Sequence, residues 1–154
     1  IIDRISKELI IKYFSGSISD NKSVSVIGDF FRLTYVENKG IAFGMMNNTN
    51  TGFLTYVMIF AIIFLIYFYY LANKSNDNIQ KYAVSFILGG AIGNLSDRLL
   101  YGKVIDFFDF DFFDFIVSRW YVFNVADSMI TTGAILLLIS TLIEYIKSKK
   151  QVTN

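Results

Sequence analysis

The chain has 154 residues, of which 54% are hydrophobic and 18% aromatic, a formal net charge of +1, and no cysteine, histidine or proline. The missing histidine and cysteine exclude a Ser-His-Asp triad, a thiolate nucleophile, a disulfide and the usual zinc sites, so a catalyst of this composition must use carboxylates, Lys, Ser, Thr, Tyr or Arg. The near-zero net charge provides no basic stripe for phosphate groups, and we therefore predict no nucleic-acid partner.

The first residues carry charged side chains after only two apolar ones. Asp3, Arg4 and Lys7 follow Ile1 and Ile2 directly. These first residues contain no apolar segment of the kind that indicates a signal peptide. We expect instead that a first membrane-spanning helix is truncated in this chain.

Residues 16–52 form a polar segment rich in Ser, Asn and Gly. Within it, residues 25–28 and 30–36 are rich in β-branched and aromatic side chains. That content predicts two strands.

Three long apolar runs follow, at about 53–72, 82–101 and 124–143. The first has no charged residue, and at roughly 1.5 Å per residue it matches the 30 Å hydrocarbon core of a bilayer. A soluble protein of this size would not need three such runs. We predict an all-α integral membrane protein with a single domain over residues 1–154.

Lysines outside the apolar runs predict the orientation in the membrane. The connection 73–81 has two lysines and the tail 147–150 has three. By the positive-inside rule both segments are cytoplasmic, which places residues 2–52 and 102–123 on the outer side.

Polar side chains within apolar runs are costly and are therefore functional candidates. Asn94 and Asp97 share a helical face, and so do Asn124 and Asp127, while Asp106 follows a helix end that we predict at Gly102. Simpler interpretations stay open at this point. Asp97 and Arg98 can form a packing ion pair, the asparagines can make interhelical hydrogen bonds, and Asp106 or Asp127 can be helix caps.

Two aspartates at the membrane surface can share one proton, because neighbouring like charges resist joint ionisation. One carboxylate then acts as base on a water molecule while the protonated one polarises a scissile carbonyl. This chemistry needs no metal, histidine or cysteine, but spacing alone does not establish that Asp106 and Asp127 meet.

Residues 106–115 alternate Asp with Phe in a low-complexity block. Four acids so close together can bind a hard cation such as calcium, but the glycine and spacing of an EF-hand loop are absent. We interpret the block as solvated acids alternating with interfacial phenylalanines, and we predict no metal site.

Five motifs together resemble the lipoprotein signal peptidase family, also called signal peptidase II. They are Asp3-Arg-Ile-Ser-Lys7, Asn38-Lys-Gly40-Ile-Ala42-Phe43, Gly89-Gly-Ala-Ile-Gly93-Asn94-Leu-Ser-Asp97-Arg98, Gly102-Lys-Val-Ile-Asp106-Phe107 and Phe123-Asn124-Val-Ala126-Asp127. Each is weak alone, but five in family order across residues 3–127 are highly specific.

The resemblance implies a four-helix membrane aspartyl peptidase of the bacterial cytoplasmic or inner membrane, without a cofactor. It implies cleavage of diacylglyceryl-modified prolipoproteins just before the lipidated cysteine, inhibition by globomycin, and an active site at the extracytoplasmic face. The outer segment 16–52 would form a small β-cradle with an interfacial amphipathic helix near Ala42–Met46. We expect a monomer that contacts membrane lipids.

The resemblance also implies roles for individual residues. Asp106 and Asp127 match the catalytic dyad. The substrate-binding and supporting positions are Asn38, Gly40, Asn94, Asp97, Arg98, Asn124 and Asp3. Two positions depart from the family pattern: Arg4 stands where Gln is usual after the first Asp, and Tyr121 stands where Pro is frequent.

Two other classes of function remain open from the sequence. A carboxylate-lined transporter or proton-coupled channel would use Asp97 and Arg98 as a relay, and these residues should then lie near the middle of the membrane. A family member that binds lipoproteins without cutting them is disfavoured by the intact pair Asp106 and Asp127.

Overall fold

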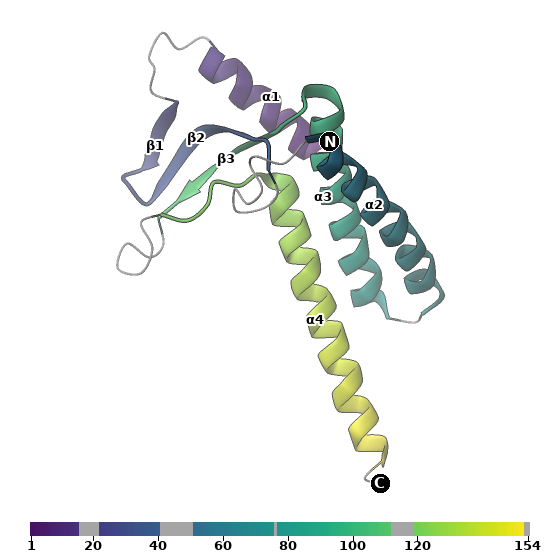
Figure 1. Cartoon of the computed structure of the whole chain (residues 1–154). Coiled ribbons are helices and arrows are strands. Elements are labelled where there is room, and N and C mark those ends of the chain that lie inside the picture. Colours follow the sequence, from purple (N-terminus) through teal and green to yellow (C-terminus); the bar gives the residue numbers. More distant parts are fainter. Residues whose placement is uncertain (16–21, 41–50, 76, 112–118, 153–154) are drawn as a thin grey trace.

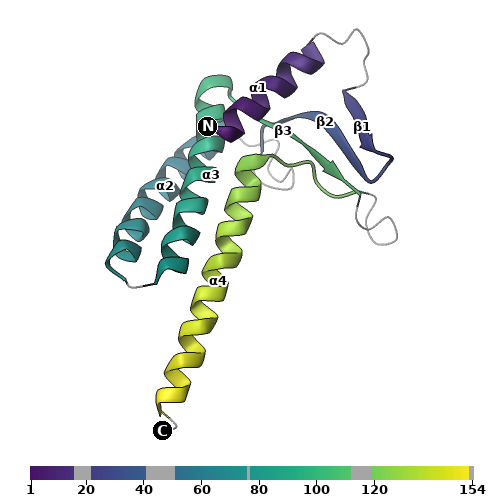
Figure 2. The ribbon, with the colours of Figure 1, turned by 180° about the vertical axis from the view of Figure 1, so that it is seen from behind.

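The computed structural model describes residues 1–15, 22–40, 51–75, 77–111 and 119–152. In chain order the elements are α1 (Ile2–Ser15), β1 (Ser23–Ile27), β2 (Phe31–Asn38), α2 (Thr51–Lys74), α3 (Asn78–Tyr101), β3 (Val104–Phe110) and α4 (Val125–Val152). Helices α2, α3 and α4 lie side by side, and α1 and the sheet lie across one end of them (Figures 1 and 2). Polar residues predicted to be functional lie where the two parts meet.

The three long helices contain the three predicted apolar runs. Among the described residues, Gly52–Lys74 and Val125–Gln151 are long and apolar enough to cross a membrane. Their apolar side chains are largely exposed, as expected for helices that face lipid. Helix α3 does not meet the same criterion. Its C-terminal half carries Asn94, Asp97 and Arg98, which lower its hydropathy.

Helices α3 and α4 pack closely because glycine removes side-chain bulk from both. A Cβ atom added at Gly90 of α3 would collide with the backbone oxygen of Ala126. One added at Gly133 of α4 would lie 2.6 Å from the backbone oxygen of Ala83. The glycines of α3 and α4 thus let the two helix backbones approach closely.

Capping residues set both ends of α3. Asp77 precedes the helix in an extended conformation, and its carboxylate accepts a hydrogen bond from the N–H of Ile79. Gly102 follows the helix with φ 68°, and its N–H donates to the carbonyl of Arg98. The predicted helix end at Gly102 is confirmed.

The three strands form one antiparallel sheet in the order β1-β2-β3. The two strands expected in the polar segment are present as β1 and β2, and Ser23 pairs with Thr34. Strand β3 returns after α3 to pair with β2, so that Asp106 lies opposite Val36. Ile105 and Phe107 of β3 pack on Ile10 of α1, which fixes the sheet against that helix.

The interpretation of the Asp/Phe block as solvated acids is wrong for its described part. Asp106 and Asp109 are 2% and 6% exposed, because they lie in β3 rather than in a loop. The carboxylate of Asp109 accepts from Thr34 Oγ1 at 2.6 Å and forms an ion pair with Arg119. Asp106 and Asp109 are each buried next to side chains that donate hydrogen bonds to them. Asp114 lies outside the described residues, as does the amphipathic helix predicted near Ala42–Met46.

The two segments whose lysines predict the orientation lie on the same side of the molecule. The connection between α2 and α3 and the C-terminal end of α4 are both at the end away from the sheet (Figure 1). Lys74, Lys81 and Lys147 belong to these segments. The fold therefore separates a lysine-bearing end from the end that carries the buried acids.

Candidate active site

Asp106 is held in β3 by two asparagine side chains. Its Oδ2 accepts a hydrogen bond from Asn38 Nδ2 at 2.9 Å, and its Oδ1 accepts one from Asn124 Nδ2 at 2.6 Å. The strand register explains the first contact, since Asn38 ends β2 opposite Val104, two residues before Asp106. Each carboxylate oxygen therefore has an amide donor that fixes its direction.

Asp127 is fixed by the way α4 begins. Asn124 occupies the N-cap, and its Oδ1 accepts from the N–H of Asp127 at 2.9 Å. In return, Asp127 Oδ2 accepts from the N–H of Asn124 at 3.2 Å. This reciprocal pair is a capping box, which satisfies two helix N–H groups that would otherwise lack partners.

Two asparagines connect the two carboxyl groups. Asn124 Nδ2 contacts Asp106, while the backbone N–H of Asn124 contacts Asp127. Asn94 of α3 donates to Asp127 Oδ1 at 2.7 Å and accepts from Asn124 Nδ2 at 3.2 Å. Residues from β3, α3 and the start of α4 thus form one hydrogen-bonded group, in which Asn124 is 0% exposed.

Burial, and after it the nearby negative charge of Asp127, raise the pKa of Asp106 to about 6. The hydrogen bonds from Asn38 and Asn124 act in the opposite direction. A pKa near neutrality lets a protonated and an ionised carboxyl group coexist in one site, as general acid–base chemistry requires.

Lys7 is a central residue of the site that the sequence interpretation did not assign. Its side chain is 0% exposed, and its Nζ lies 2.8 Å from both Asp3 Oδ2 and Asp97 Oδ2. It also donates to Asn94 Oδ1 at 3.1 Å. The signal in the sequence was the four-residue spacing of Asp3 and Lys7, which puts both on one helical face.

Asp3 also fixes the start of α4. Its Oδ1 accepts a hydrogen bond from the N–H of Ala126 at 2.9 Å. Asp3 therefore keeps close partners although Arg4 replaces the family's Gln. Arg4 itself turns toward Tyr101, Glu8 and Asp97.

The packing ion pair suggested for Asp97 and Arg98 does not form. Asp97 pairs with Lys7 and, at 3.5 Å, with Arg4. Arg98 instead donates to the carbonyl of Gly40 and, at 3.4 Å, to that of Asn94. Neighbouring residues on a helix point in different directions, which separates the two side chains.

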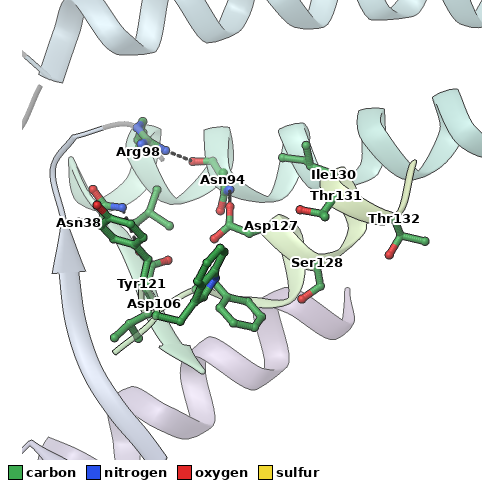
Figure 3. A pocket seen from close by; sticks show the side chains of 14 residues that line it. Asn38, Asn94, Arg98, Asp106, Tyr121, Asp127, Ser128, Ile130, Thr131 and Thr132 are labelled. Carbon is green, nitrogen blue, oxygen red and sulfur yellow. Dashed lines mark hydrogen bonds between the residues drawn. The ribbon is translucent and has the colours of Figure 1, made fainter. Parts of the chain in front are cut away.

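A cavity of about 640 Å³ adjoins the two aspartates. Figure 3 shows the side chain of Asp127 against that of Asn94. Ser128 and Thr131 of α4 extend the lining away from the acids (Figure 3). The cavity lining consists of Asn38, Asn94, Arg98, Val104, Asp106, Trp120, Tyr121, Val122, Phe123, Asp127, Ser128, Ile130, Thr131 and Thr132.

The candidate residues form two groups. The first lines the cavity: Asn38, Asn94, Arg98, Asp106 and Asp127. The second lies behind or beside it: Asn124 and Gly40 contact the first group directly, whereas Asp3 and Asp97 act through Lys7. The simpler interpretations hold in part, because Asn94 does bridge helices and Asp127 does take part in a cap.

A family model described as "Signal peptidase (SPase) II" matches residues 1–143. The chain belongs to the signal peptidase II family. The lipoprotein signal peptidase of Caldanaerobacter subterraneus subsp. tengcongensis is 42% identical over 136 residues, which cover 88% of this chain and 85% of the relative. That of Clostridium tetani is 39% identical over 139 residues, with 90% and 84% coverage.

Solved structures agree with this membership of the signal peptidase II family. Two structures described as a bacterial membrane enzyme are 30% and 31% identical to the chain, with TM-scores of 0.78 and 0.74. They cover 94% and 92% of this chain, and the matched regions are 82% and 85% of those structures. The protein is therefore a peptidase, and with its two long apolar helices it is a membrane protein.

Proposed function

We propose that this signal peptidase II family member is an intramembrane aspartyl endopeptidase. It removes the signal peptide from diacylglyceryl-modified prolipoproteins by cleaving just before the lipidated cysteine. The observation that carries the proposal is that Asp106 and Asp127, from distant parts of the chain, share Asn124 as a hydrogen-bonding neighbour and line one cavity. The names of the relatives support the class of substrate.

In the proposed mechanism the two aspartates hold one proton between them. The ionised carboxylate takes a proton from a water molecule, and the water oxygen bonds to the scissile carbonyl carbon while the protonated carboxyl donates to the carbonyl oxygen. Collapse of the tetrahedral intermediate breaks the C–N bond, and the amine leaves with a proton from the pair. Asn38, Asn94 and Asn124 keep both carboxyl groups directed at the substrate.

Arg98 is the residue that we assign to substrate binding beside Asn38 and Gly40. Its side chain is 8% exposed, and within the described part of the chain its Nε has no hydrogen-bond partner. A buried donor without a partner is unfavourable, so a carbonyl group of the substrate would stabilise it. Asn94, Asn124, Asp97 and Asp3 support the site from behind.

We also assign the arrangement in the membrane. Helices α2, α3 and α4 lie in the bacterial cytoplasmic or inner membrane, and α1 crosses one end of them and contributes Asp3 and Lys7 against α3 and α4. The lysine-bearing end faces the cytoplasm and the sheet lies outside, which puts the active site at the extracytoplasmic face. This position at one end disfavours a relay near the middle of the membrane.

The enzyme acts as a monomer that contacts lipid, and globomycin competes with its substrate. The glycines of α3 pack against residues of the same chain, so they do not offer a face for a dimer. A Cβ atom at Gly89 would lie 3.2 Å from Met129, and one at Gly93 would lie 3.2 Å from the Cβ of Ala126.

The direct test uses purified protein in detergent and a diacylglyceryl-modified prolipoprotein. We expect a mass loss equal to the signal peptide, blocked by globomycin, and no cleavage of the same precursor without its lipid. Asp106→Asn and Asp127→Asn should each abolish cleavage while the protein stays folded. Glu144→Gln, at an exposed position far along α4, is the matched control and should cleave normally. Near-normal activity of either aspartate variant would remove that residue from the dyad.

A further inference from the structure

Arg119 stands out because its backbone is strained. Its φ is 130°, and within the described ranges it is the only residue other than glycine with a positive φ. Such a conformation costs energy and persists only where the surroundings hold it in place. The contacts of its side chain show what holds it.

The guanidinium of Arg119 contacts three acidic residues in or next to the sheet. Its Nε donates to Asp109 Oδ1 at 3.0 Å, and its Nη2 donates to the carbonyl of Asp29 at 3.1 Å. Its Nη1 lies 3.6 Å from Asp111 Oδ2. Asp109 is itself buried and bonded to Thr34, so the anchor is rigid. Arg119 thereby ties the turn between β1 and β2 to the end of β3.

The residues after Arg119 run from this anchor to the active-site cavity. The N–H of Trp120 donates to the carbonyl of Phe110 at 3.1 Å, and Phe123 and Phe108 exchange backbone hydrogen bonds of 3.0 and 2.7 Å. The segment is thus held along β3 at both ends. Between them, residues 120–122 line the cavity that contains Asp106.

The same three residues also line a second cavity of about 290 Å³, together with Val36 and Glu37. Asp106 and Asn38 line both cavities. A substrate chain that is cut at Asp106 must extend away from it on both sides. Residues 120–122 line both cavities, so they border the space on either side of Asp106 that the substrate chain can occupy.

We propose that Arg119 is a positioning residue, which holds Trp120–Val122 beside Asp106 through its contacts with Asp109 and Asp29 and so sets how the substrate chain enters. The inference rests on the proposed function, because it names a determinant of substrate entry to the same site. Within the described ranges, the side chain of Arg119 contacts Asp29, Asp109 and Asp111, and it does not contact the aspartate pair or its asparagines. Its loss should therefore weaken substrate binding and leave the chemical step largely intact.

Trp120 is the only tryptophan of the chain, so its fluorescence reports on this segment without any activity. We would compare Arg119→Gln with Arg32→Gln in the full chain. Arg32 is a matched control, since its side chain is 31% exposed against 29% for Arg119 and it also pairs with Asp29, but it lies on β2. We expect acrylamide to quench Trp120 about twofold more strongly in Arg119→Gln only.

Kinetics of prolipoprotein cleavage provide the second measurement. We expect KM to rise about fivefold in Arg119→Gln with kcat within about twofold of the wild-type value, whereas Arg32→Gln changes neither. Arg119→Lys keeps the charge but loses the planar fork, so it should fall between wild type and Arg119→Gln. Asp109→Asn combined with Arg119→Gln should add little to the single variants, because both remove the same contact.

Equal quenching and equal KM for Arg119→Gln and Arg32→Gln would overturn the proposal and leave the proposed function standing. A fall in kcat without a change in KM would also overturn it. If Arg119→Gln does not fold, Arg119→Lys is judged by the same two measurements. If the wild-type protein cleaves no lipidated precursor, the proposed function fails, and the quenching comparison still decides whether Arg119 holds Trp120.

Discussion

Lys7 Nζ lies 2.8 Å from Asp97 Oδ2, and both side chains are almost completely buried between α1 and α3. With Asp3 on its other side, the ammonium group connects α1 to α3 and to the first turn of α4. It is the cation that offsets two buried carboxylates behind the aspartate pair.

Replacing Lys7 by Met should strongly destabilise the protein, because Asp3 and Asp97 would keep buried charges without their partner. Breaking a buried ion pair by removing one member costs about 3–5 kcal/mol. We expect a lower thermal unfolding temperature in detergent and a parallel loss of activity. Adding Asp97→Asn to Lys7→Met should recover part of the stability, and a double variant less stable than Lys7→Met alone would contradict this account.

The asparagine between the two aspartates allows the helix cap to be separated from the chemistry. Asn124→Ser keeps a good N-cap residue but removes the amide that contacts Asp106. We expect the free energy of unfolding to fall by only about 1–3 kcal/mol, because the cap is kept while Asp106 and Asn94 lose a buried donor. The value of kcat should fall on the order of 100-fold, because Asp106 loses a donor that directs its carboxyl group. An Asn124→Ser enzyme with normal kcat would show that this contact is only structural.

The pKa of Asp106, raised to about 6, predicts the pH dependence of cleavage. Above that pH the pair loses its shared proton and has no general acid, so kcat/KM should fall as the pH rises through 6. Bound substrate excludes more water and raises the pKa again, which should place the limb of the kcat profile at higher pH. The pH profiles of kcat/KM and of kcat, measured with one lipidated precursor in a single detergent, would check both predicted falls.

The same raised pKa links Asp106 to stability. In the unfolded chain the carboxyl ionises near its ordinary value of 3.8, whereas in the folded protein it stays protonated until about 6. The folded state binds more protons in this window, so the free energy of unfolding should fall as the pH rises from 4 to 6 and then level off. Asp106→Asn should remove that fall and be more stable than wild type at pH 7. Thermal unfolding of both proteins across this range is the measurement.

The departure from the family at Arg4 should matter little. Its guanidinium lies 4.7 Å from the ring centre of Tyr101 and its Nε donates to Glu8 at 2.9 Å, both at a partly exposed position. Partly exposed contacts of this kind contribute about 1 kcal/mol or less. Arg4→Gln should therefore leave activity within twofold and lower stability only slightly, by roughly 1 kcal/mol. Asp3→Asn, which loses contacts to Lys7 and Ala126, is the contrasting variant and should be far less stable.

The helices could be predicted from hydropathy, and their ends could not. The apolar run 124–143 starts at the residue before α4, and the helix continues past the run to Val152. Its last turns carry Lys149 and Lys150, so they are helical without being apolar, and a hydropathy criterion stops before them. The end of α3 at Gly102 was predicted, because glycine readily adopts the left-handed backbone conformation that ends a helix.

Strand β3 was missed because its pairing is not local. Its partner β2 lies about 70 residues earlier in the chain, and Asp106 pairs with Val36 across that separation. Alternating Asp and Phe suggested an exposed interface, since the sequence does not show which donors the fold brings to each acid. The shared surroundings of Asp106 and Asp127 were expected from the family resemblance and not from spacing. Their catalytic role stays a prediction.

Asn124 caps the start of α4 and also contacts Asp106, which couples local unfolding to the active site. If the first turn of α4 frays, the N–H of Asp127 loses its acceptor and Asp106 loses a donor in the same event. The rate of hydrogen exchange at the Asp127 amide would then report how often the first turn of α4 opens and the active site is lost. An inhibitor that seats between the two acids should slow that exchange, even though it touches no part of the helix backbone.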